Sequence, residues 1–481
     1  MDGKLDTDVL IAGAGPVGLF LANECARRNL RYQIVEARAA QSEHSKALAI
    51  LPRTLEIFDM AGIATPFVAA ANRVTSVAII THGRTLVEMP FAPEESPYPF
   101  IAMVPQDTTE RLLFEELQKK GGGVQYETTF AGAVQDAEGV DVTLEHQGGS
   151  FHRRAAFVVG CDGAHSAVRK AMGLTMEGGE YPDSFMLADI ETNESLPANQ
   201  LQLCPSEFGP AAIFPMSPTR RRLVATVERT EGEAPTLAVV RSILEQRGPA
   251  GFEAHSLYWS SYFRIHHRRA ATLRVGRMFI AGDAAHIHSP FGGQGMNTGL
   301  HDVWNLVWKL DLYLNGHGSD ALLDTYTAER VPVIRSVIEM TDILTKAMGT
   351  PNRFAQALRN AVIPMVSRLA PVQHAFVKRL SELGIAYPSS PIVEGPGIRY
   401  LDESMRGGNG IRSRFLVITD EASEEMNELS SRFSDVVEVR KAGRPGITLV
   451  RPDGYTAYVS HRAGDPNAVA AIKTLLLKQA G

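Results

Sequence analysis

The sequence predicts an α/β protein of several domains, and three observations support this prediction. A glycine-rich turn lies inside a strand–turn–helix–strand unit over residues 7–36. Residues 183–264 are rich in short β-branched and apolar runs, and the composition changes near residue 390. A chain of 481 residues is also too long for one ordinary hydrophobic core, so two or three domains are expected.

Composition restricts the class of protein. Apolar residues make up 44% and charged residues 21%, as in ordinary globular proteins. The formal net charge of -6 comes without a basic block, so nucleic acid is not an expected partner. No run reaches the roughly 18 apolar residues of a membrane span, and the N-terminus lacks a signal-peptide pattern. The three cysteines lie far apart, which argues against a disulfide framework and favours a reducing cytoplasm.

The N-terminal unit predicts a dinucleotide site. An apolar run over residues 9–12 leads into Gly-Ala-Gly-Pro-Val-Gly at residues 13–18, and a helical pattern and a second strand follow. The glycines permit a tight turn and close approach of the backbone to a pyrophosphate, which the positive end of the helix then faces. Glu36 ends the second strand, where a carboxylate can bind an adenosine ribose. The unit alone does not distinguish FAD from NAD.

The remaining elements are predicted from periodicity and turn residues. Helices are expected over 53–62, 107–120, 236–246 and 296–314, and a β-meander over 124–160. Helices over 328–383 are expected to break at Pro332, Pro351, Pro364 and Pro371. A separate small α/β unit is expected at the C-terminus, with strands at 415–418, 436–439, 447–450 and 457–459 and helices at 421–433 and 466–478.

Two further motifs each place a turn after an apolar strand. Residues 158–169 read Val-Val-Gly-Cys-Asp-Gly-Ala-His-Ser-Ala-Val-Arg, and residues 277–286 read Arg-Met-Phe-Ile-Ala-Gly-Asp-Ala-Ala-His. The second motif leads into Ser-Pro-Phe-Gly-Gly-Gln-Gly-Met-Asn-Thr-Gly at residues 289–299. Together with the N-terminal loop, these motifs resemble the three fingerprints of class A flavoprotein monooxygenases, the single-component aromatic hydroxylases that include the p-hydroxybenzoate and phenol hydroxylases. The resemblance covers about residues 5–335.

The resemblance implies an α/β fold with three domains. A Rossmann-like FAD-binding domain of the p-hydroxybenzoate hydroxylase type would comprise residues 1–75, 101–182 and 265–390. A β-sheet substrate domain would comprise residues 76–100 and 183–264. Residues 396–481 resemble the thioredoxin-like C-terminal domain of larger aromatic hydroxylases. This domain contains no cysteine, which excludes a C-x-x-C redox role and leaves a structural or homodimer-contacting one.

The resemblance also assigns the cofactor site. The glycine loop and Glu36 would hold the ADP part of FAD, and Asp283 would lie at its ribityl–pyrophosphate region. The helix that begins at residues 295–297 would lie under the flavin, where its N-terminus stabilises the negative charge of the reduced ring. The expected FAD-binding residues are Gly13, Gly15, Pro16, Val17, Gly18, Glu36, Ala37, Arg38, Lys46, Gln106, Asp162, Gly282, Asp283, Pro290, Gly293, Gly295, Met296 and Asn297.

Some of these residues have alternative interpretations. Asp162 is similar to a residue tied to the fold and to nicotinamide use, but such a carboxylate can also simply brace its turn. Lys46 stands where many relatives carry arginine, so a phosphate contact there would lack bidentate geometry. His286 and His288 form an HxH pair without the further ligands that zinc needs, so no metal site is expected.

The function implied by the resemblance is hydroxylation of an aromatic, phenolic or polyketide-like small molecule. NADPH or NADH would reduce FAD, O2 would add at flavin C4a, and the hydroperoxide would transfer a hydroxyl group inside a dry cavity. Pro290 and Phe291 would form the catalytic pocket in front of the flavin without an acid–base role. The candidates for a group that promotes phenol ionisation are Tyr181, Tyr258, Tyr262 and His255. No carboxylate-binding arginine is obvious, and the choice between NADPH and NADH stays open.

Three alternative functions share the predicted fold. A flavin-dependent halogenase would need a W-x-W-x-I-P element, which the three tryptophans do not form. A flavin reductase or dehydrogenase would consume nicotinamide without incorporating oxygen into a product. A non-enzymatic flavin-fold carrier would bind FAD without consuming nicotinamide at all.

Overall fold

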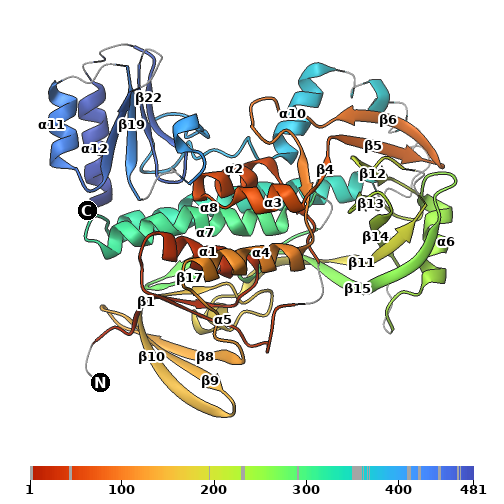
Figure 1. Cartoon of the computed structure of the whole chain (residues 1–481), viewed down its shortest axis with the longest axis horizontal. Helices are drawn as coiled ribbons and strands as arrows, with labels where there is room; N and C mark the ends of the chain where they lie inside the picture. The colour runs from red at the N-terminus through yellow and green to blue at the C-terminus, as the bar shows by residue number, and fades with distance from the viewer. Residues whose placement is uncertain are drawn as a thin grey trace.

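The computed structural model describes residues 4–42, 46–193, 196–228, 233–289, 292–348, 360, 362–365, 367, 369–408, 413–420, 424–441, 446–462, 465 and 467–480. Three parts of the molecule can be followed in Figure 1. A seven-stranded sheet and the long helices lie at the centre and lower left, an eight-stranded sheet lies at the right, and the blue C-terminal unit lies at the upper left. Within the described ranges, no helix is both long and apolar enough to span a bilayer.

The seven-stranded sheet brings the three sequence motifs to one edge. Its strands are β1 (Thr7–Ala12), β2 (Tyr32–Val35), β8 (Thr128–Gln135), β9 (Val140–His146), β10 (Gly149–Gly160), β16 (Arg274–Val275) and β17 (Met278–Ile280). β1 pairs in parallel with β2 and β10, and β10 pairs in parallel with β17. The register aligns Ala12 with Gly160 and Gly160 with Ile280. The turns that follow β1, β10 and β17 therefore leave the sheet side by side.

Helices cover this sheet. They are α1 (Pro16–Arg27), α2 (Pro52–Ala61), α3 (Ala64–Ala70), α4 (Gln106–Lys119), α5 (Ala167–Ala171), α7 (Gly295–Leu314) and α8 (Asp320–Met348). α1 packs against α4 and α7, and its side chains Leu19, Phe20 and Leu21 are buried in the largest hydrophobic core. The predicted βαβ unit, β-meander and the helices near 53–62, 107–120 and 296–314 are confirmed.

One helix prediction was wrong. α8 runs through Pro332 without a break. A proline removes one backbone hydrogen bond from a helix, but α8 buries Tyr326, Val333 and Ile334 on either side of it, and this packing offsets the loss. Pro371 lies in the first turn of α10 (Ala370–Leu380), where proline is well tolerated. Pro364 lies among the helical residues 362–365, and Pro351 lies outside the described residues.

The eight-stranded sheet forms the second part. Its strands are β5 (Ser76–Thr81), β6 (Arg84–Pro90), β11 (Met176–Thr192), β12 (Gln200–Cys204), β13 (Ala211–Pro215), β14 (Arg220–Val227), β15 (Ala254–Ala270) and β18 (His286–Ile287). Their order is β18-β15-β11-β14-β13-β12-β5-β6. The helix expected near 236–246 is α6 (Leu237–Arg247). β18 directly follows the 310 turn η1 (Gly282–Ala284), so this sheet reaches the edge at which the three motifs meet.

A small three-stranded sheet lies between these two parts. It consists of β3 (Ala49–Ile50), β4 (Asn72–Val74) and β7 (Ile101–Met103). Val74, Ile101 and Met103 share a hydrophobic cluster with Leu201 of the eight-stranded sheet and with Leu380 of α10. This cluster joins α10 to the eight-stranded sheet, as the position of α10 above β5 and β6 in Figure 1 also shows.

The C-terminal unit is a mixed four-stranded sheet with two helices. Its strands are β19 (Phe415–Thr419), β20 (Val437–Lys441), β21 (Ile447–Val450) and β22 (Thr456–Ser460), and its helices are α11 (Glu424–Arg432) and α12 (Ala468–Ala480). The 310 turn η2 (Glu403–Met405) precedes them. All the elements predicted for this unit are present. Its hydrophobic core also includes Trp308 and Leu312 of α7 and Leu322 of α8, so the unit is packed onto the central helices.

Candidate active site

The glycine loop after β1 is tightly packed on one side and open on the other. Gly13 has a φ of +101°, and a Cβ atom there would lie 2.4 Å from the carbonyl oxygen of Cys161. A Cβ atom at Gly18 would lie 1.9 Å from the carbonyl oxygen of Gly13. In contrast, a Cβ atom at Gly15 would meet nothing within 4 Å. α1 therefore begins beside open space, and no side chain caps its N-terminus, which suits a phosphate group.

Glu36 lies behind this loop, held by two neighbours. Its Oε2 atom accepts a hydrogen bond from the backbone N–H of Ala14 (2.8 Å), and its Oε1 atom accepts one from Arg38 Nε (3.0 Å). Burial opposes ionisation of this carboxyl group, but the hydrogen bonds from Arg38 and Ala14 lower its pKa. Glu36 is thus a fixed carboxylate, while Ala37 is exposed beside it.

Asp162 acts on its own turn. Its carboxylate accepts hydrogen bonds from the hydroxyl group of Ser166 and from the backbone N–H groups of Ala167 (2.7 Å) and Val168 (3.1 Å). These contacts hold the start of α5. The neighbours Cys161 and Gly163 line the cavity described below, whereas Asp162 lies behind its wall. The contacts favour the bracing interpretation, and a cofactor contact by Asp162 stays a prediction.

The Gly282–Asp283 turn after β17 is held from below by Asp302. The Asp302 carboxylate accepts hydrogen bonds from the backbone N–H of Gly282 (3.1 Å) and from Arg330 Nε (2.7 Å). His286 Nε2 also lies 2.8 Å from the Asp302 carboxylate, so this nitrogen is engaged in a contact within the protein. Asp283 itself faces the cavity, where the surrounding protein raises the pKa of its carboxyl group against the opposing effect of His286 and Lys46.

The N-terminus of α7 meets the same space. Gly293, Gly295 and Met296 line the cavity. Asn297 does not line it, because its side chain fastens the first turn of α7 to the three-stranded sheet and to α2. Asn297 Nδ2 donates to the carbonyl oxygens of Ala49 (2.9 Å) and Gly293 (2.8 Å), and Oδ1 accepts from the backbone N–H of Leu51 (2.9 Å) and from the hydroxyl group of Thr54 (2.8 Å). Pro290 and Phe291, predicted to front the flavin, lie outside the described residues.

These turns surround one cavity of about 720 Å3. Of the predicted cofactor residues, it is lined by Gly15, Pro16, Val17, Arg38, Lys46, Gln106, Gly282, Asp283, Gly293, Gly295 and Met296. Gln106 is held in place because its Oε1 atom accepts from the backbone N–H of Ala47 (3.0 Å) and its Nε2 atom donates to Glu110 (2.9 Å). Gly13, Gly18, Glu36, Asp162 and Asn297 support the wall from behind, as described above.

The other wall of the cavity lies in the β-rich segment expected to bind the substrate, but its individual residues were not predicted from the sequence. It is formed by the inner face of the eight-stranded sheet and carries Leu187, Phe214, Val224, Trp259, Ser261 and Phe263. Trp259, Ser261 and Phe263 alternate along β15, so they share one face of the sheet. That alternation was a usable signal, but the sequence alone does not say which face of β15 points toward the glycine loop.

Arg222 also lines the cavity, but its donors are already used. Its Nε and Nη2 atoms donate to the two oxygens of Asp189 at 2.7 and 2.9 Å. Its Nη1 atom donates to the carbonyl oxygens of Lys46 (3.0 Å) and Ala47 (3.2 Å). The bidentate ion pair therefore braces the segment that carries Lys46 and does not offer a free cation to a substrate.

Three of the four base candidates proposed from the sequence do not line this cavity. Tyr258 is exposed and donates to Glu191, and His255 lies in a different surface pocket beside Gly83. Tyr262 packs in the hydrophobic cluster on the other face of the sheet. The side chain of Tyr181 lies outside the described residues. These positions correct the prediction for all three residues. Tyr258 and Tyr262 alternate with the cavity-lining residues of β15 and so point to the opposite face, whereas His255 lies at the start of that strand, in another pocket.

Besides His165, the cavity is lined by His288. Its Nδ1 atom lies 3.0 Å from the carbonyl oxygen of Ser289, and its ring stacks on His286 with centroids 6.3 Å apart. Burial, together with the neighbouring His286, lowers the pKa of His288 to about 4. The ring is therefore neutral near pH 7. Cys161 lines the cavity as well, and burial raises the pKa of its thiol well above the ordinary value.

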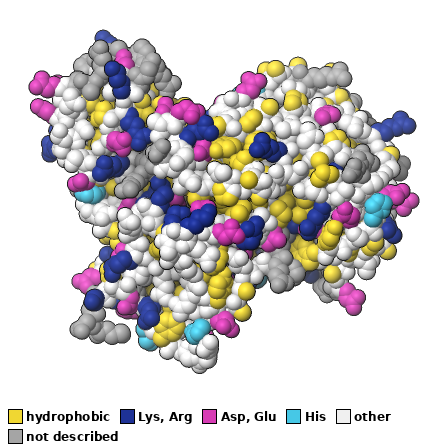
Figure 2. Space-filling view, in the orientation of Figure 1, with side chains coloured by type: hydrophobic (Ala, Val, Ile, Leu, Met, Phe, Trp, Pro, Cys, Tyr) yellow, Lys and Arg dark blue, Asp and Glu magenta, His cyan; other side chains and the backbone are white. Residues whose placement is uncertain are grey.

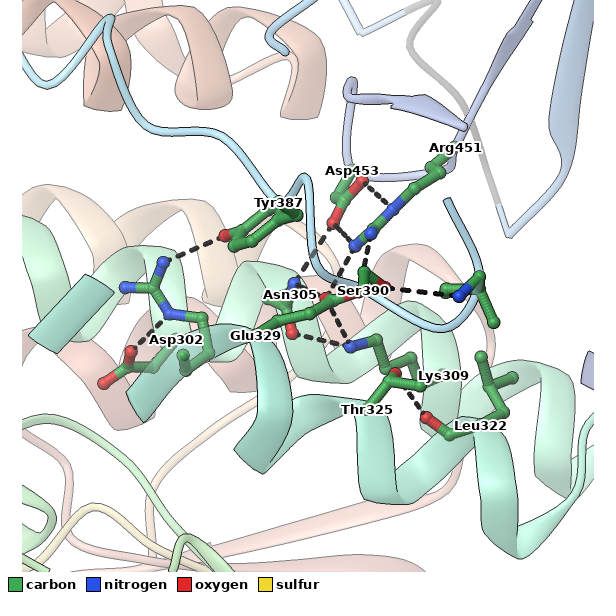
Figure 3. A network of polar contacts seen from close by, with 12 residues as sticks. Asp302, Asn305, Lys309, Leu322, Thr325, Glu329, Tyr387, Ser390, Arg451 and Asp453 are labelled. Atoms are coloured by element: carbon green, nitrogen blue, oxygen red, sulfur yellow. Dashed lines mark hydrogen bonds and ion pairs between the residues drawn. The ribbon is translucent and has the colours of Figure 1, made fainter. Parts of the chain in front are cut away.

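A buried polar network lies behind the site and connects it to the C-terminal unit (Figure 3). Arg330 joins Asp302 to the hydroxyl group of Tyr387 (2.9 Å). The adjacent Glu329 accepts two hydrogen bonds from Arg451 at 2.6 and 2.8 Å and one from Lys309 at 2.8 Å. Burial opposes the charge on Glu329, but these two cations lower the pKa of its carboxyl group far below the ordinary value.

The fold and the cavity define a flavoprotein, and comparison with known proteins agrees. The family model of the FAD binding domain matches residues 6–341, and the chain belongs to this family. It is 30% identical to 6-methylpretetramide 4-monooxygenase of Streptomyces rimosus, with 98% of this chain and 93% of the relative aligned. It is also 30% identical to the rifampicin monooxygenase of Streptomyces venezuelae, over 94% of this chain and 95% of that protein.

Solved structures give the same result. The OxyS anhydrotetracycline hydroxylase from Streptomyces rimosus superimposes with a TM-score of 0.79 and 29% identity, covering 97% of this chain and 98% of that one. The flavin-dependent monooxygenase PieE, solved in complex with FAD and substrate, shares the fold with a TM-score of 0.82 at 21% identity, covering 99% of this chain and all of that one. The protein is an FAD-dependent aromatic monooxygenase with the p-hydroxybenzoate hydroxylase type of fold and a small C-terminal mixed-sheet domain.

Proposed function

We propose that the protein hydroxylates a neutral, multi-ring phenol, with NADPH or NADH as reductant and O2 as oxidant. The observation that carries this proposal is the single cavity of about 720 Å3 that joins the glycine loop to the apolar face of the eight-stranded sheet. Its sheet wall is apolar apart from Ser261 and Arg222, and the guanidinium of Arg222 is engaged by Asp189. Such a wall suits an uncharged aromatic skeleton better than a benzoate. The tetracycline and rifampicin substrates in the names of the relatives are also multi-ring compounds.

Each wall of the cavity has a proposed role. The N-terminus of α1 and Glu36 would bind the ADP part of FAD, Asp283 its central region, and the N-terminus of α7 the negative charge of the reduced ring. Bound FAD would supply hydride uptake from the nicotinamide and activation of oxygen. Trp259 and Phe263 would orient the substrate and exclude water. Ser261 and His288 are the polar side chains best placed to meet a substrate hydroxyl group.

We keep the domain division of the sequence analysis as a proposal. Residues 1–75, 101–182 and 265–390 would bind FAD, residues 76–100 and 183–264 would bind the substrate, and residues 396–481 would form the C-terminal domain. The grouping of β5 and β6 with β11–β15 supports it. The packing of α10 on the eight-stranded sheet supports assigning that helix to the substrate side instead. A homodimer and a cytoplasmic location stay predictions; the free cysteines Cys25, Cys161 and Cys204 are compatible with the latter.

Anaerobic reduction of the bound flavin by NADPH tests the proposed function. The rate is measured alone, with neutral multi-ring phenols such as 1-naphthol and anthrarufin, and with 4-hydroxybenzoate. We expect acceleration by a neutral multi-ring phenol, followed under air by incorporation of one atom of labelled O2 into the product. Acceleration by 4-hydroxybenzoate alone would overturn the proposed substrate class. NADPH oxidation without incorporation with any compound would overturn the proposed hydroxylation.

A further inference from the structure

A second large cavity lies behind α10. It measures about 630 Å3, within the range of small-molecule sites, and is bounded by α8, α10 and the stretch 382–390. α10 separates it from a small apolar pocket of about 50 Å3 beside Gly292 and Gly293. Phe376 and Leu380 face the small pocket, while Lys378 and Arg379 of the same helix line the large cavity. Figure 2 shows hydrophobic side chains gathered in the hollow between the C-terminal unit and the lobe of the eight-stranded sheet.

The walls of this second cavity have the chemistry of an amphipathic site. Val333, Val337 and Met340 of α8, together with Ile385, supply apolar surface. At the mouth, Lys378 and Arg379 are exposed and carry positive charge. Glu329 also lines the cavity, but its carboxylate is engaged by Arg451 and Lys309 and is not free to repel an anion.

Two polar side chains in the wall are buried and incompletely paired. Gln294 is 1% exposed, and its Oε1 atom has no hydrogen-bond partner among the described residues. Glu382 is 3% exposed, and its Oε2 atom likewise makes no hydrogen bond there, although it lies 3.5 Å from His301 Nδ1. Glu382 also holds a φ of +60°, a left-handed conformation uncommon for residues other than glycine. Both oxygen atoms are closed off from the cavity, and a buried oxygen without a partner, such as Gln294 Oε1, gains a hydrogen bond when its side chain turns toward a ligand that brings a donor.

Gln294 connects the second cavity to the flavin side of the molecule. Its Nε2 atom donates to the backbone carbonyl oxygen of Arg379 (3.2 Å). Its backbone carbonyl oxygen accepts the first helical hydrogen bond of α7 from the backbone N–H of Thr298 (2.8 Å). Its neighbours Gly293 and Gly295 line the cofactor cavity. A molecule that engages Gln294 therefore contacts the segment that places the N-terminus of α7.

We propose that this second cavity binds an aromatic effector with a hydroxyl group at its inner end and an anionic group at its mouth. The Gln294 side chain turns toward the cavity so that its Oε1 atom accepts a hydrogen bond from the hydroxyl group. The ring packs between Val337 and Ile385, and the anion meets Lys378 and Arg379. Binding adjusts the start of α7 through Gln294 and so changes the environment of the flavin. Only this last effect rests on the proposed function; the binding itself does not.

The probe for this site is 6-hydroxy-2-naphthoate, whose hydroxyl and carboxylate groups lie at opposite ends of a rigid fluorescent ring. Its binding to the FAD-loaded enzyme is titrated by calorimetry and by its own fluorescence. Val337→Trp fills the cavity from α8 and is expected to weaken the cavity-bound component more than tenfold. Ile343→Trp on the same helix is the matched control, because Ile343 is 64% exposed and lies outside the cavity lining. It is expected to leave binding within twofold of the parent.

A second pair of variants tests the site independently, in case Val337→Trp does not fold. Lys378→Met removes an exposed charge at the mouth and is expected to weaken binding about threefold, whereas Lys346→Met, which removes an exposed lysine outside the cavity, is expected to leave it unchanged. Equal affinity in the parent, Val337→Trp and Lys378→Met would overturn the proposal, since the probe would then occupy only the cofactor-side cavity. Binding that is lost in Val337→Trp while substrate-stimulated NADPH oxidation persists would support it. Probe binding is measured separately from hydroxylation. A protein that does not hydroxylate the tested phenols can therefore still be shown to bind the probe in this cavity.

Discussion

At the residue scale, the site depends on a few polar side chains whose partners are fixed by the protein. Glu36 is oriented by Ala14 and Arg38 before any cofactor binds, and Asn297 uses both ends of its amide to fasten α7. Such preorganisation means that a cofactor need not order these groups itself. Substitutions that keep the size of the side chain but change its hydrogen bonding are therefore the informative ones.

Glu36→Gln is expected to weaken FAD binding by about 10- to 100-fold, because a charge-assisted hydrogen bond contributes roughly 1.5–3 kcal/mol. FAD fluorescence quenching during titration of the apoprotein measures the dissociation constant. Glu145→Gln, an exposed change in the β-meander, is the control and should leave the constant unaltered. Equal affinities for the parent and Glu36→Gln would show that Glu36 only holds the loop.

The buried carboxyl group of Glu382 leads us to expect that the stability of the protein depends on pH. Burial raises the pKa of its carboxyl group to about 8, against the attraction of Arg330 and the hydrogen bond from Thr298. A raised pKa in the folded state means that Glu382 does not oppose folding below its unfolded pKa of about 4.5. Stability is then lost as the pH rises from there to the folded pKa of about 8, and the loss is complete above it. Glu382→Gln should remove this loss.

The measurement is the melting temperature at pH 5, 7 and 9. We expect the parent to lose stability between pH 5 and 9 more steeply than Glu382→Gln, with the two curves furthest apart at pH 9. Glu207→Gln, at an exposed position, should follow the parent at every pH. Parallel curves for the parent and Glu382→Gln would show that Glu382 does not titrate in this range.

At the element scale, α7 connects the cofactor cavity to the rest of the protein. Its first turn borders the cavity, its middle carries Asp302 under the Gly282 turn, and its last turns contribute Trp308 and Leu312 to the core of the C-terminal unit. Because one rigid helix carries all three contacts, damage at its N-terminus should affect cofactor binding and stability together.

Asn297→Asp keeps the shape of the side chain but replaces two donors by an acceptor that faces the carbonyl oxygens of Ala49 and Gly293. We expect a loss of about 2–4 kcal/mol in unfolding free energy from two buried, unpaired acceptors and added repulsion. Urea unfolding and FAD content would measure the two effects. Asn315→Ala, at the exposed end of the same helix, should change stability by less than about 1 kcal/mol. A similar loss in both variants would contradict a special role for Asn297.

The extent to which the sequence predicted the structure follows from the same elements. The βαβ unit, the β-meander, α7 and the C-terminal unit were predicted because their turns and periodicities are local signals. The continuity of α8 through Pro332 was missed because tertiary packing overrides a local helix breaker. The glycine loop and the Gly282–Asp283 turn were found as motifs, whereas Trp259, Phe263 and Arg222 were not. Their place in the cavity depends on how two sheets pack, and no single segment encodes that.

At the scale of the whole molecule, the C-terminal unit is bound to the catalytic part by a shared core and by buried ions. Trp308 of α7 packs edge-on against Phe415, with ring centroids 5.7 Å apart. Arg451 and Asp453 enter the network of Glu329, and the carbonyl oxygen of Asp453 accepts hydrogen bonds from Trp304 (3.0 Å) and Arg53 (3.1 Å). The unit is thus an integral support of α7 and α8.

Arg451→Met should therefore destabilise the holoenzyme by about 3–5 kcal/mol, because it leaves the buried carboxylates of Glu329 and Asp453 short of a partner. Arg440→Met in the same unit breaks a partly exposed pair with Glu438 and exposed hydrogen bonds to Ser404, and it should change stability by at most about 1 kcal/mol. Urea unfolding of the two variants side by side is the measurement. Equal effects would mean that the network contributes no more than a surface ion pair.

Cys161 has a consequence for the lifetime of the enzyme. A catalyst that activates oxygen releases some hydrogen peroxide, and the species that peroxide attacks is the thiolate, not the thiol. Cys161 lines the cavity in which this chemistry is expected, yet its raised pKa keeps it protonated. Burial likewise raises the pKa of Cys25 and holds that of Cys204 at about 12. The fold therefore places all three cysteine sulfur atoms in their least oxidisable form, and damage by the enzyme's own by-product should begin at other residues.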